Sequence, residues 1–378
     1  MFPRFLVAVT VARFAVFALP IGLFFAAAAA PSQARAVLAT ASALTIGSGL
    51  GLWSVGWLLD RIGRWRGLRL SMVAGAGSLV VLAVAVGWAW SQPAVLAVAM
   101  VSGIAWSPVI ATPRALLPEV VRRSRLPWAS GIEAASIEAA LILAPLAGAL
   151  LGRWRPAATP AVAAGLLMVS AVLLPAGTDV HRPASDGRPL LSRPVTALVG
   201  LALLLGLSGG LMEPGLAAVP STLFGEVAGN AALFVAIAIG SAAGGLIAAR
   251  TAWPSRAVHS VALFALHAVA LVGAATTGGL VQLGLLVVAG LPIAPLQSLA
   301  GLHLDRVAGP RRASETFGLV ATVLTLGAGA GQAIAAQATG QLDPQHLVLL
   351  ASVPPLVAAI LVALRQSGRS LSTTGRST

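Results

Sequence analysis

Twelve long apolar runs, separated by short polar segments, constrain the fold of this chain more than any other feature. They lie at roughly 5–29, 37–59, 69–91, 94–115, 128–152, 157–177, 195–217, 229–249, 258–276, 279–301, 314–338 and 346–365. A helix of about 20 residues crosses a hydrocarbon layer of about 30 Å. Hydrophobic residues make up 58% of the chain and charged residues 9%, which excludes an ordinary water-soluble domain. The sequence therefore predicts an all-α membrane protein with twelve transmembrane helices.

The first run has an alternative interpretation as a cleaved secretory signal, because an apolar stretch is followed by the small residues AAAAAPSQA. Its apolar core is about 25 residues long and contains Arg13, whereas the apolar region of a signal spans 7 to 15 residues. We therefore interpret this run as the first membrane helix.

The 24 basic residues are all arginine, and they are distributed unevenly around the expected helices. With the N terminus in the cytoplasm, only Arg35, Arg153 and Arg155 fall outside and Arg13 lies within a helix; the other twenty face the cytoplasm. Such asymmetry is typical of cytoplasmic loops. The sequence thus predicts a multi-pass protein of the bacterial inner membrane with both termini in the cytoplasm, and it explains the net charge of +13 without nucleic acid.

The absence of some residue types excludes several kinds of chemistry. Without cysteine there is no thiolate nucleophile, and without lysine there is no phosphate-binding loop of the GxxxxGK type. The five histidines show no HExxH pattern or paired spacing, so no metal site or cofactor is expected. No polar segment is long enough for an ATP-binding domain, which leaves an ion gradient as the energy source.

The sequence indicates an internal duplication. GWLLDR at 56–61 has a weaker echo in GLIAAR at 245–250, half the chain later, and residues 178–193 form the one long polar linker. We expect a six-helix bundle over 1–177, a cytoplasmic linker over 178–193, a second six-helix bundle over 194–365 and a cytoplasmic tail over 366–378.

The corner after the second run, GWLLDRIGRWRG, resembles the signature of the major facilitator superfamily of secondary transporters. The residues that match this signature are Gly56, Leu58, Asp60, Arg61, Gly63 and Arg64; Trp65 stands where a second basic residue is usual. PRALLPEV at 113–120 and SIEAALILAPLAG at 136–148 also resemble small bacterial efflux members, although Ala144 precedes Pro145 where a glycine is usual.

The resemblance implies a role for the corner and for two further charges. Gly56, Asp60, Arg61, Gly63 and Arg64 would form a cytoplasmic latch between the two halves. A carboxylate at a helix C terminus is unfavourable without a cationic partner, which suits Asp60 to that role. Alternatively, the arginines only set the topology and bind lipid headgroups. Arg114 and Glu138 match family positions in the fourth and fifth helices.

Charges inside membrane helices need a partner or a water-filled cavity, since each costs roughly 2.5 to 3.5 kcal/mol. Counting residues permits a pair between Arg13 and Glu138, with Arg114 near Glu133. The two glutamates are roughly 140° apart on the helix, so only one can face a central cavity. We favour Glu138 as the acid that takes up a proton when its arginine is withdrawn. A permanent structural ion pair is the alternative.

Other polar residues have two interpretations each. Glu213, beside Pro214 in GGLMEPG, is either a cavity acid or a loop residue. Gln282, Gln297, Gln332, Gln337 and His267 either contact a substrate or hydrogen-bond between helices, and the second is favoured. GLSGG at 206–210 matches a serine-nucleophile pattern, with His259 and His267 as conceivable partners of Ser208, but glycine-rich helices produce such matches by chance.

The sequence as a whole predicts a non-enzymatic secondary transporter that works as a monomer by alternating access. We expect proton-coupled export of a small amphipathic compound. Proton-coupled uptake of a metabolite, or a membrane sensor or scaffold on the same fold, is the alternative.

Overall fold

The computed structural model describes the chain except residues 156, 178–192, 221–222, 224–225, 252–256, 309–312 and 375–378. In several helix segments it describes the backbone but not the side chains, and these segments include Gly56, Asp60 and residues 301–308, 313–317 and 366–374. The linker expected at 178–193 thus lies almost wholly outside the described residues.

The described part of the first half contains seven α-helices and two short 3-10 turns, Pro31–Gln33 and Arg123–Arg125. The helices are α1 (Phe2–Ala29), α2 (Ala34–Ile62), α3 (Arg64–Gly87), α4 (Gln92–Trp106), α5 (Pro108–Val120), α6 (Leu126–Trp154) and α7 (Ala158–Leu173). The described part of the second half contains α8 (Arg193–Ala218), α9 (Glu226–Thr251), α10 (Ala257–Thr276), α11 (Gly279–Gly290), α12 (Ile293–Ala308), α13 (Ala313–Ala338), α14 (Pro344–Leu350) and α15 (Val353–Thr374). The last helix continues into the segment expected as a tail.

These helices form the twelve predicted spans. Over the described residues, eleven segments are long and apolar enough to cross a membrane, and the sixth span is the shorter apolar helix α7, of 16 residues. Three spans consist of two helices each, namely α4 with α5, α11 with α12, and α14 with α15. The prediction of an all-α, twelve-helix membrane protein is confirmed.

Proline explains where these three spans break. Pro108, Pro292 and the pair Pro354 and Pro355 each lack the N–H that would continue the helical ladder. At the first break, Pro108 lacks the N–H that would bond the carbonyl of Ile104. The Ser107 hydroxyl donates to this carbonyl instead, at 2.9 Å. The fourth and tenth spans are broken at corresponding places in the two halves.

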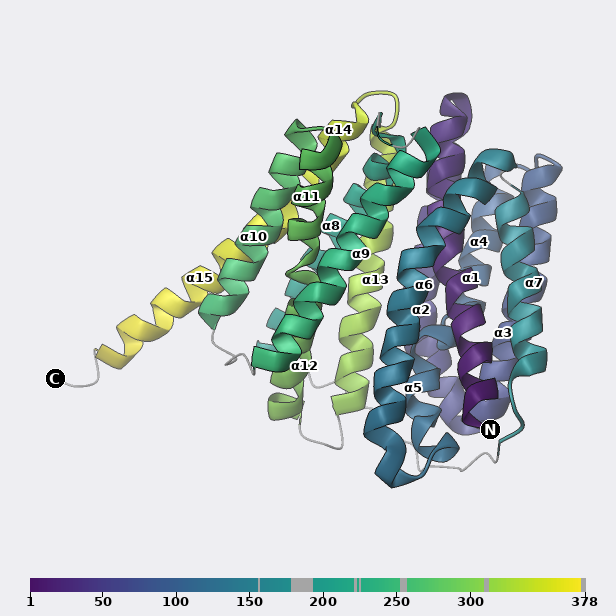
Figure 1. The fold of residues 1–378 in the computed structure, drawn as a ribbon, viewed down its shortest axis with the longest axis horizontal. Coiled ribbons are helices and arrows are strands. Elements are labelled where there is room, and N and C mark those ends of the chain that lie inside the picture. The colour runs from purple at the N-terminus through teal and green to yellow at the C-terminus, as the bar shows by residue number, and fades with distance from the viewer. Residues whose placement is uncertain are drawn as a thin grey trace.

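Helices pack in the same order in both halves. In the first half α1 packs on α6, α2 on α4 and α3 on α7; in the second, α8 packs on α13, α9 on α11 and α10 on α15. Figure 1 shows the two groups side by side. The protein therefore consists of two pseudo-symmetric six-helix bundles.

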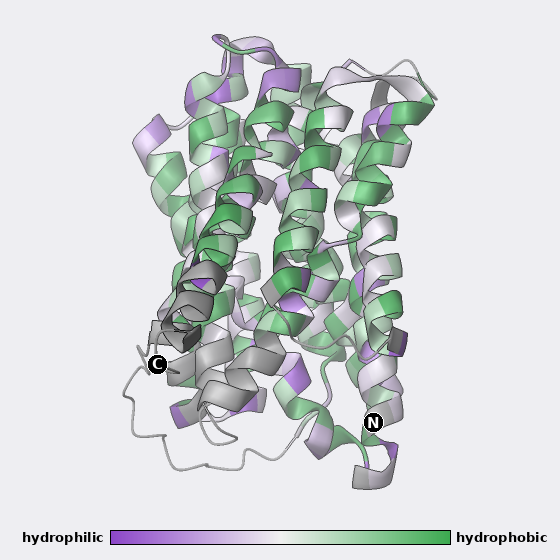
Figure 2. Ribbon diagram, turned by 90° about the vertical axis from the view of Figure 1, so that its left-hand side faces the viewer, coloured by the Kyte–Doolittle hydropathy of each residue, from purple (hydrophilic) through white to green (hydrophobic). Residues whose placement is uncertain are grey.

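Hydrophobic residues occupy the middle of the helices, and hydrophilic ones gather at both ends (Figure 2). The chain begins at one end of the molecule, with the first turn of α1, and we call this end the terminal face; the other end, with Ala29, Trp88 and Trp154, is the opposite face. Trp88 and Trp154 are 76% and 71% exposed, and such tryptophans favour the membrane interface.

Glycines let α8 and α13 approach closely. A Cβ atom at Gly206 or Gly210 would overlap the carbonyl groups of Leu324 or Ala328, and Gly327 and Gly331 face the backbone of α8 in the same way. GAGAG at 327–331, which resembles a dinucleotide-binding fragment, is thus a helix-packing surface.

We expect Gly210→Ala to destabilise the protein by about 1 to 3 kcal/mol, because the added methyl group meets backbone atoms that cannot yield without separating the helices. Thermal unfolding in detergent measures the effect. The matched control is Gly209→Ala, since a Cβ at Gly209 meets nothing within 4 Å. Equal stability of the two variants would contradict the close contact.

Candidate functional site

The charged corner is a turn of one residue. α2 ends at Ile62, α3 begins at Arg64, and Gly63 between them has φ 98° and ψ 135°. Only glycine adopts this backbone conformation without strain, which explains Gly63 of the signature. The side chains of Gly56 and Asp60 lie outside the described residues, while Arg61 is exposed and Arg64 is half-buried at the terminal face.

Trp65, which departs from the signature, bonds an acid. Its indole Nε1–H donates to Glu119 Oε2 at 2.9 Å, and its ring packs edge-on against Phe5 with centroids 5.7 Å apart. Trp65 is only 4% exposed. The contact joins α3 to the end of α5 beneath the corner, and the sequence analysis did not identify it.

A buried ion pair lies inside the first bundle. Arg13 Nη2 of α1 is 2.6 Å from Glu133 Oε1 of α6, and each side chain is 1% exposed. Arg13 also donates to the carbonyl of Ile110 on α5 at 3.2 Å. Arg114, exposed on α5, acts electrostatically on Arg13. One guanidinium thus connects α1, α5 and α6.

This geometry corrects the expected pairing of Arg13 with Glu138. Counting residues compares Cα depths, whereas helical side chains lean toward the N terminus of their own helix. α1 and α6 both begin at the terminal face. The long Arg13 side chain therefore extends toward that face and meets Glu133, five residues before Glu138.

Glu138 has a different environment. It lies about 18 Å along α6 from Leu126, at about 1.5 Å per residue, and is half-buried. Its Oε2 is enclosed and has no hydrogen-bond partner among the described residues. The separation of the two glutamates around the helix agrees with the sequence analysis, since Glu133 faces α1 and Glu138 does not share its partner.

A second acid and amide lie near the opposite face. Gln332 Nε2 of α13 is 3.5 Å from Glu213 Oε2 of α8. Gln332 is 2% exposed, and Glu213 is half-buried. α8 continues through Pro214 to Ala218, so Glu213 is a helix residue rather than a loop residue.

The remaining polar residues of the second half differ in exposure. Gln282 is 3% exposed and donates to the carbonyl of Ala274 at 3.0 Å, which connects α11 to α10. His267 is 2% exposed, whereas Gln297 on α12 is exposed. Burial and backbone bonding favour helix packing for Gln282 and His267.

Ser208 and His267 are in contact, and each side chain also bonds a backbone carbonyl beside one of the helix breaks. The Ser208 hydroxyl donates to the carbonyl of Ala351 at 2.6 Å, which Pro355 leaves without its helical donor. His267 Nδ1 lies 2.6 Å from the carbonyl of Ala289, in the last turn of α11 before the second break. Ser208 Oγ and His267 Nε2 are 3.4 Å apart, with the serine completely buried. A nucleophile needs access to a substrate, and this pair has none.

Several contacts between the two halves lie near the opposite face and in the middle of the bundle. Near that face Arg35 of α2 bonds Gln337 of α13, and Phe25 of α1 packs on Phe234 of α9 with centroids 5.8 Å apart. Deeper, the Ser42 hydroxyl donates to the carbonyl of Gly329 at 2.8 Å. Sequence offers little signal for these contacts, because three of the groups involved are apolar or backbone atoms.

Over the described ranges, no three His, Asp or Glu side chains lie close enough to hold a metal ion.

Comparisons with solved structures show the same fold. A transporter of the POT family in complex with a thioalcohol-conjugated peptide superposes with a TM-score of 0.70 at 13% identity, covering 97% of this chain and 96% of the other. A POT family transporter in complex with 5-aminolevulinic acid superposes with a TM-score of 0.71 at 13% identity, covering 96% of this chain and 95% of the other. A mutant of the nucleoside transporter NupG superposes with a TM-score of 0.69 at 10% identity, covering 95% of this chain and 99% of the other.

No curated protein sequence gives a significant match. The family description Major Facilitator Superfamily matches residues 5–332, which is most of the chain. This match agrees with the twelve helices, the two bundles and the signature corner. The chain therefore belongs to the Major Facilitator Superfamily of membrane transporters.

Proposed function

We propose that this secondary transporter couples proton movement to the export of a small amphipathic compound across the bacterial inner membrane, with the terminal face in the cytoplasm. The family and the structural neighbours support a secondary transporter without enzymatic activity. The described arginines at the terminal face, among them Arg4, Arg61, Arg64 and Arg69, support the orientation. Proton-coupled uptake is the second candidate, and the same experiment distinguishes the two.

The observation that carries the proton coupling is the isolated carboxyl group of Glu138. It lies deep in a membrane helix with one oxygen enclosed and no hydrogen-bond partner for that oxygen in the described part of the chain. It can bind and release a proton without breaking a salt bridge, whereas proton binding at Glu133 would break the pair with Arg13. We therefore assign the coupling role to Glu138 and a structural role to Arg13 and Glu133, with Arg114 beside them.

The contacts between the halves support alternating access. Those of α2 with α13 and of α1 with α9 run from the opposite face to the middle of the bundle. We infer that this arrangement is closed toward the outside. Transport then requires Arg35 and Gln337 to separate as one bundle rocks against the other.

We further propose that Gly56, Asp60, Arg61, Gly63 and Arg64 form the latch that holds the halves together at the terminal face in the other state. Asp60→Asn removes the charge of the latch and keeps its shape, so it is expected to raise the population of the state closed toward the outside. Labelling of cysteines introduced one at a time on each face measures this balance, and the chain has no native cysteine to interfere. If Asp60→Asn and the unchanged protein are labelled equally on both faces, Asp60 has no role in the latch.

The substrate is the part of the function that needs a direct search. The neighbours with a peptide conjugate and with 5-aminolevulinic acid share only the fold with this chain. The few membrane charges and the absence of tyrosine favour an apolar or weakly polar compound. A thermal-shift screen of antibiotics, dyes, sugars and amino acids should identify a ligand, because a ligand that binds the folded state raises its stability.

Flux of that ligand in proteoliposomes with an imposed pH gradient tests the function. Export by exchange predicts that ligand moves against the direction of proton flow, whereas coupled uptake predicts movement in the same direction. Ligand binding without any flux would favour a sensor or scaffold and contradict the proposal.

A further inference from the structure

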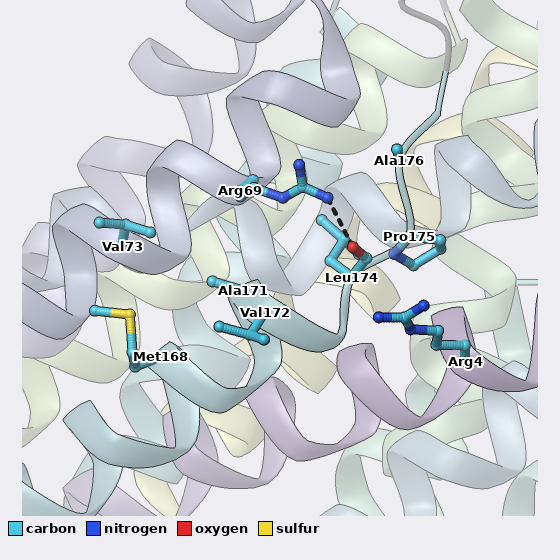
Figure 3. A pocket seen from close by; sticks show the side chains of 9 residues that line it. All are labelled: Arg4, Arg69, Val73, Met168, Ala171, Val172, Leu174, Pro175 and Ala176. Atoms are coloured by element: carbon cyan, nitrogen blue, oxygen red, sulfur yellow. Dashed lines mark hydrogen bonds between the residues drawn. The ribbon is translucent and has the colours of Figure 1, made fainter.

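A groove opens on the surface of the first bundle at the terminal face. It lies between the start of α1, the first turns of α3 and the end of α7, and its volume is about 540 Å³. Figure 3 shows Arg4 and Arg69 on either side of the Leu174–Pro175 backbone, with Val73, Met168 and Val172 farther along the helices. The groove therefore has a cationic end and an apolar end.

The cationic end is fixed by the fold. Arg69 Nη2 donates to the carbonyl of Leu174 at 2.7 Å, just after the last residue of α7. A guanidinium has five N–H donors, so this bond leaves others for a ligand. Arg4 lies in the first turn of α1, and neither arginine is paired with a carboxylate in the described part of the chain. Two guanidinium groups thus face one groove, and no carboxylate of the described residues neutralises them.

The apolar end continues from the arginines toward the middle of the membrane. Val73 follows Arg69 by one turn of α3, and Met168 precedes Val172 by one turn of α7. Their exposed fractions are 41%, 42% and 71%, and in a membrane helix such exposed apolar side chains contact lipid. One helical turn, about 5.4 Å, separates the charged level from the apolar level on α3.

We propose that this groove binds an anionic phospholipid, with its phosphate on Arg4 and Arg69 and one acyl chain along Val73, Met168 and Val172. Basic pockets between membrane helices on the cytoplasmic side suit such headgroups. A free phosphate would use only the cationic end, and a zwitterionic lipid would gain less from two guanidinium groups. The bound lipid joins α1, α3 and α7 at the face that carries the corner.

Lipid titration of the purified protein in detergent tests the proposal, with binding followed by native mass spectrometry and by thermal unfolding. Phosphatidylglycerol is expected to bind and to raise the unfolding temperature more than phosphatidylcholine or inorganic phosphate does. Arg4→Gln with Arg69→Gln should weaken phosphatidylglycerol binding by about 30-fold. The matched control, Arg122→Gln with Arg125→Gln, removes the same charge at the same face and should bind normally.

A third variant tests the apolar end. Val172→Trp adds bulk to an exposed position, so the protein should fold, and it should weaken lipid binding although both arginines remain. Equal binding by the Arg4 and Arg69 variant and its control would overturn the proposal. Normal phosphatidylglycerol binding by Val172→Trp, or an equal response to inorganic phosphate, would also overturn it, because the arginines would then bind phosphate alone.

Discussion

Arg13→Gln is expected to destabilise the folded protein by about 3 to 5 kcal/mol, because it leaves the carboxylate of Glu133 buried without its partner. Both side chains are 1% exposed, and the pair is 2.6 Å long. The substitution also removes the bond to the carbonyl of Ile110, so α5 loses a contact with α1. Reversible unfolding in mixed micelles measures the change.

A double variant distinguishes the cost of removing the whole ion pair from the cost of leaving one charge buried without its partner. Arg13→Met with Glu133→Leu removes both charges and keeps an apolar volume, so it should cost clearly less than Arg13→Gln alone. The comparison also distinguishes a structural pair from a coupling pair, because the double variant should retain proton-coupled flux. If Arg13→Gln costs less than about 1 kcal/mol, the ion pair does not support the bundle as we describe.

Glu138→Gln is expected to reduce proton-coupled flux to the background of empty liposomes while the protein stays folded and binds ligand. Glutamine keeps the shape of the carboxyl group but cannot exchange a proton. Glu138 is half-buried and has no salt bridge in the described part of the chain, so little stability should be lost. Proton movement reported by a pH-sensitive dye inside proteoliposomes, together with ligand flux, provides the measurement.

The control is Glu213→Gln, since Glu213 is another half-buried membrane acid and lies near the opposite face beside Gln332. Our assignment expects this variant to keep its coupling. Normal coupling in Glu138→Gln and loss of coupling in Glu213→Gln would transfer the role to Glu213.

The fold could be predicted from the sequence because lipid imposes a strong constraint. Backbone groups in a bilayer must bond within their own segment, so apolar runs of sufficient length become helices. The prolines at 108 and 292 identify the broken spans only once the helices are known. Gly63 marked the corner, and its positive φ explains why a glycine is required there.

The partners of individual side chains could not be predicted. Most of the α1 surface is apolar, so its sequence does not indicate which helix Arg13 faces. Arg13 pairs with Glu133 and not with Glu138 because its side chain extends toward the N terminus of α1. Ser208, His267 and Ser42 bond backbone carbonyls, which every residue carries and which therefore leave no trace in the sequence.

The central claim, that the halves separate at the opposite face during each cycle, is tested most directly by joining Arg35→Cys to Gln337→Cys with a short cleavable cross-linker. The chain has no cysteine of its own, so only these two positions react. We expect complete cross-linking to stop ligand flux and cleavage of the linker to restore it. Flux that continues at an unchanged rate in fully cross-linked protein would contradict alternating access in this protein.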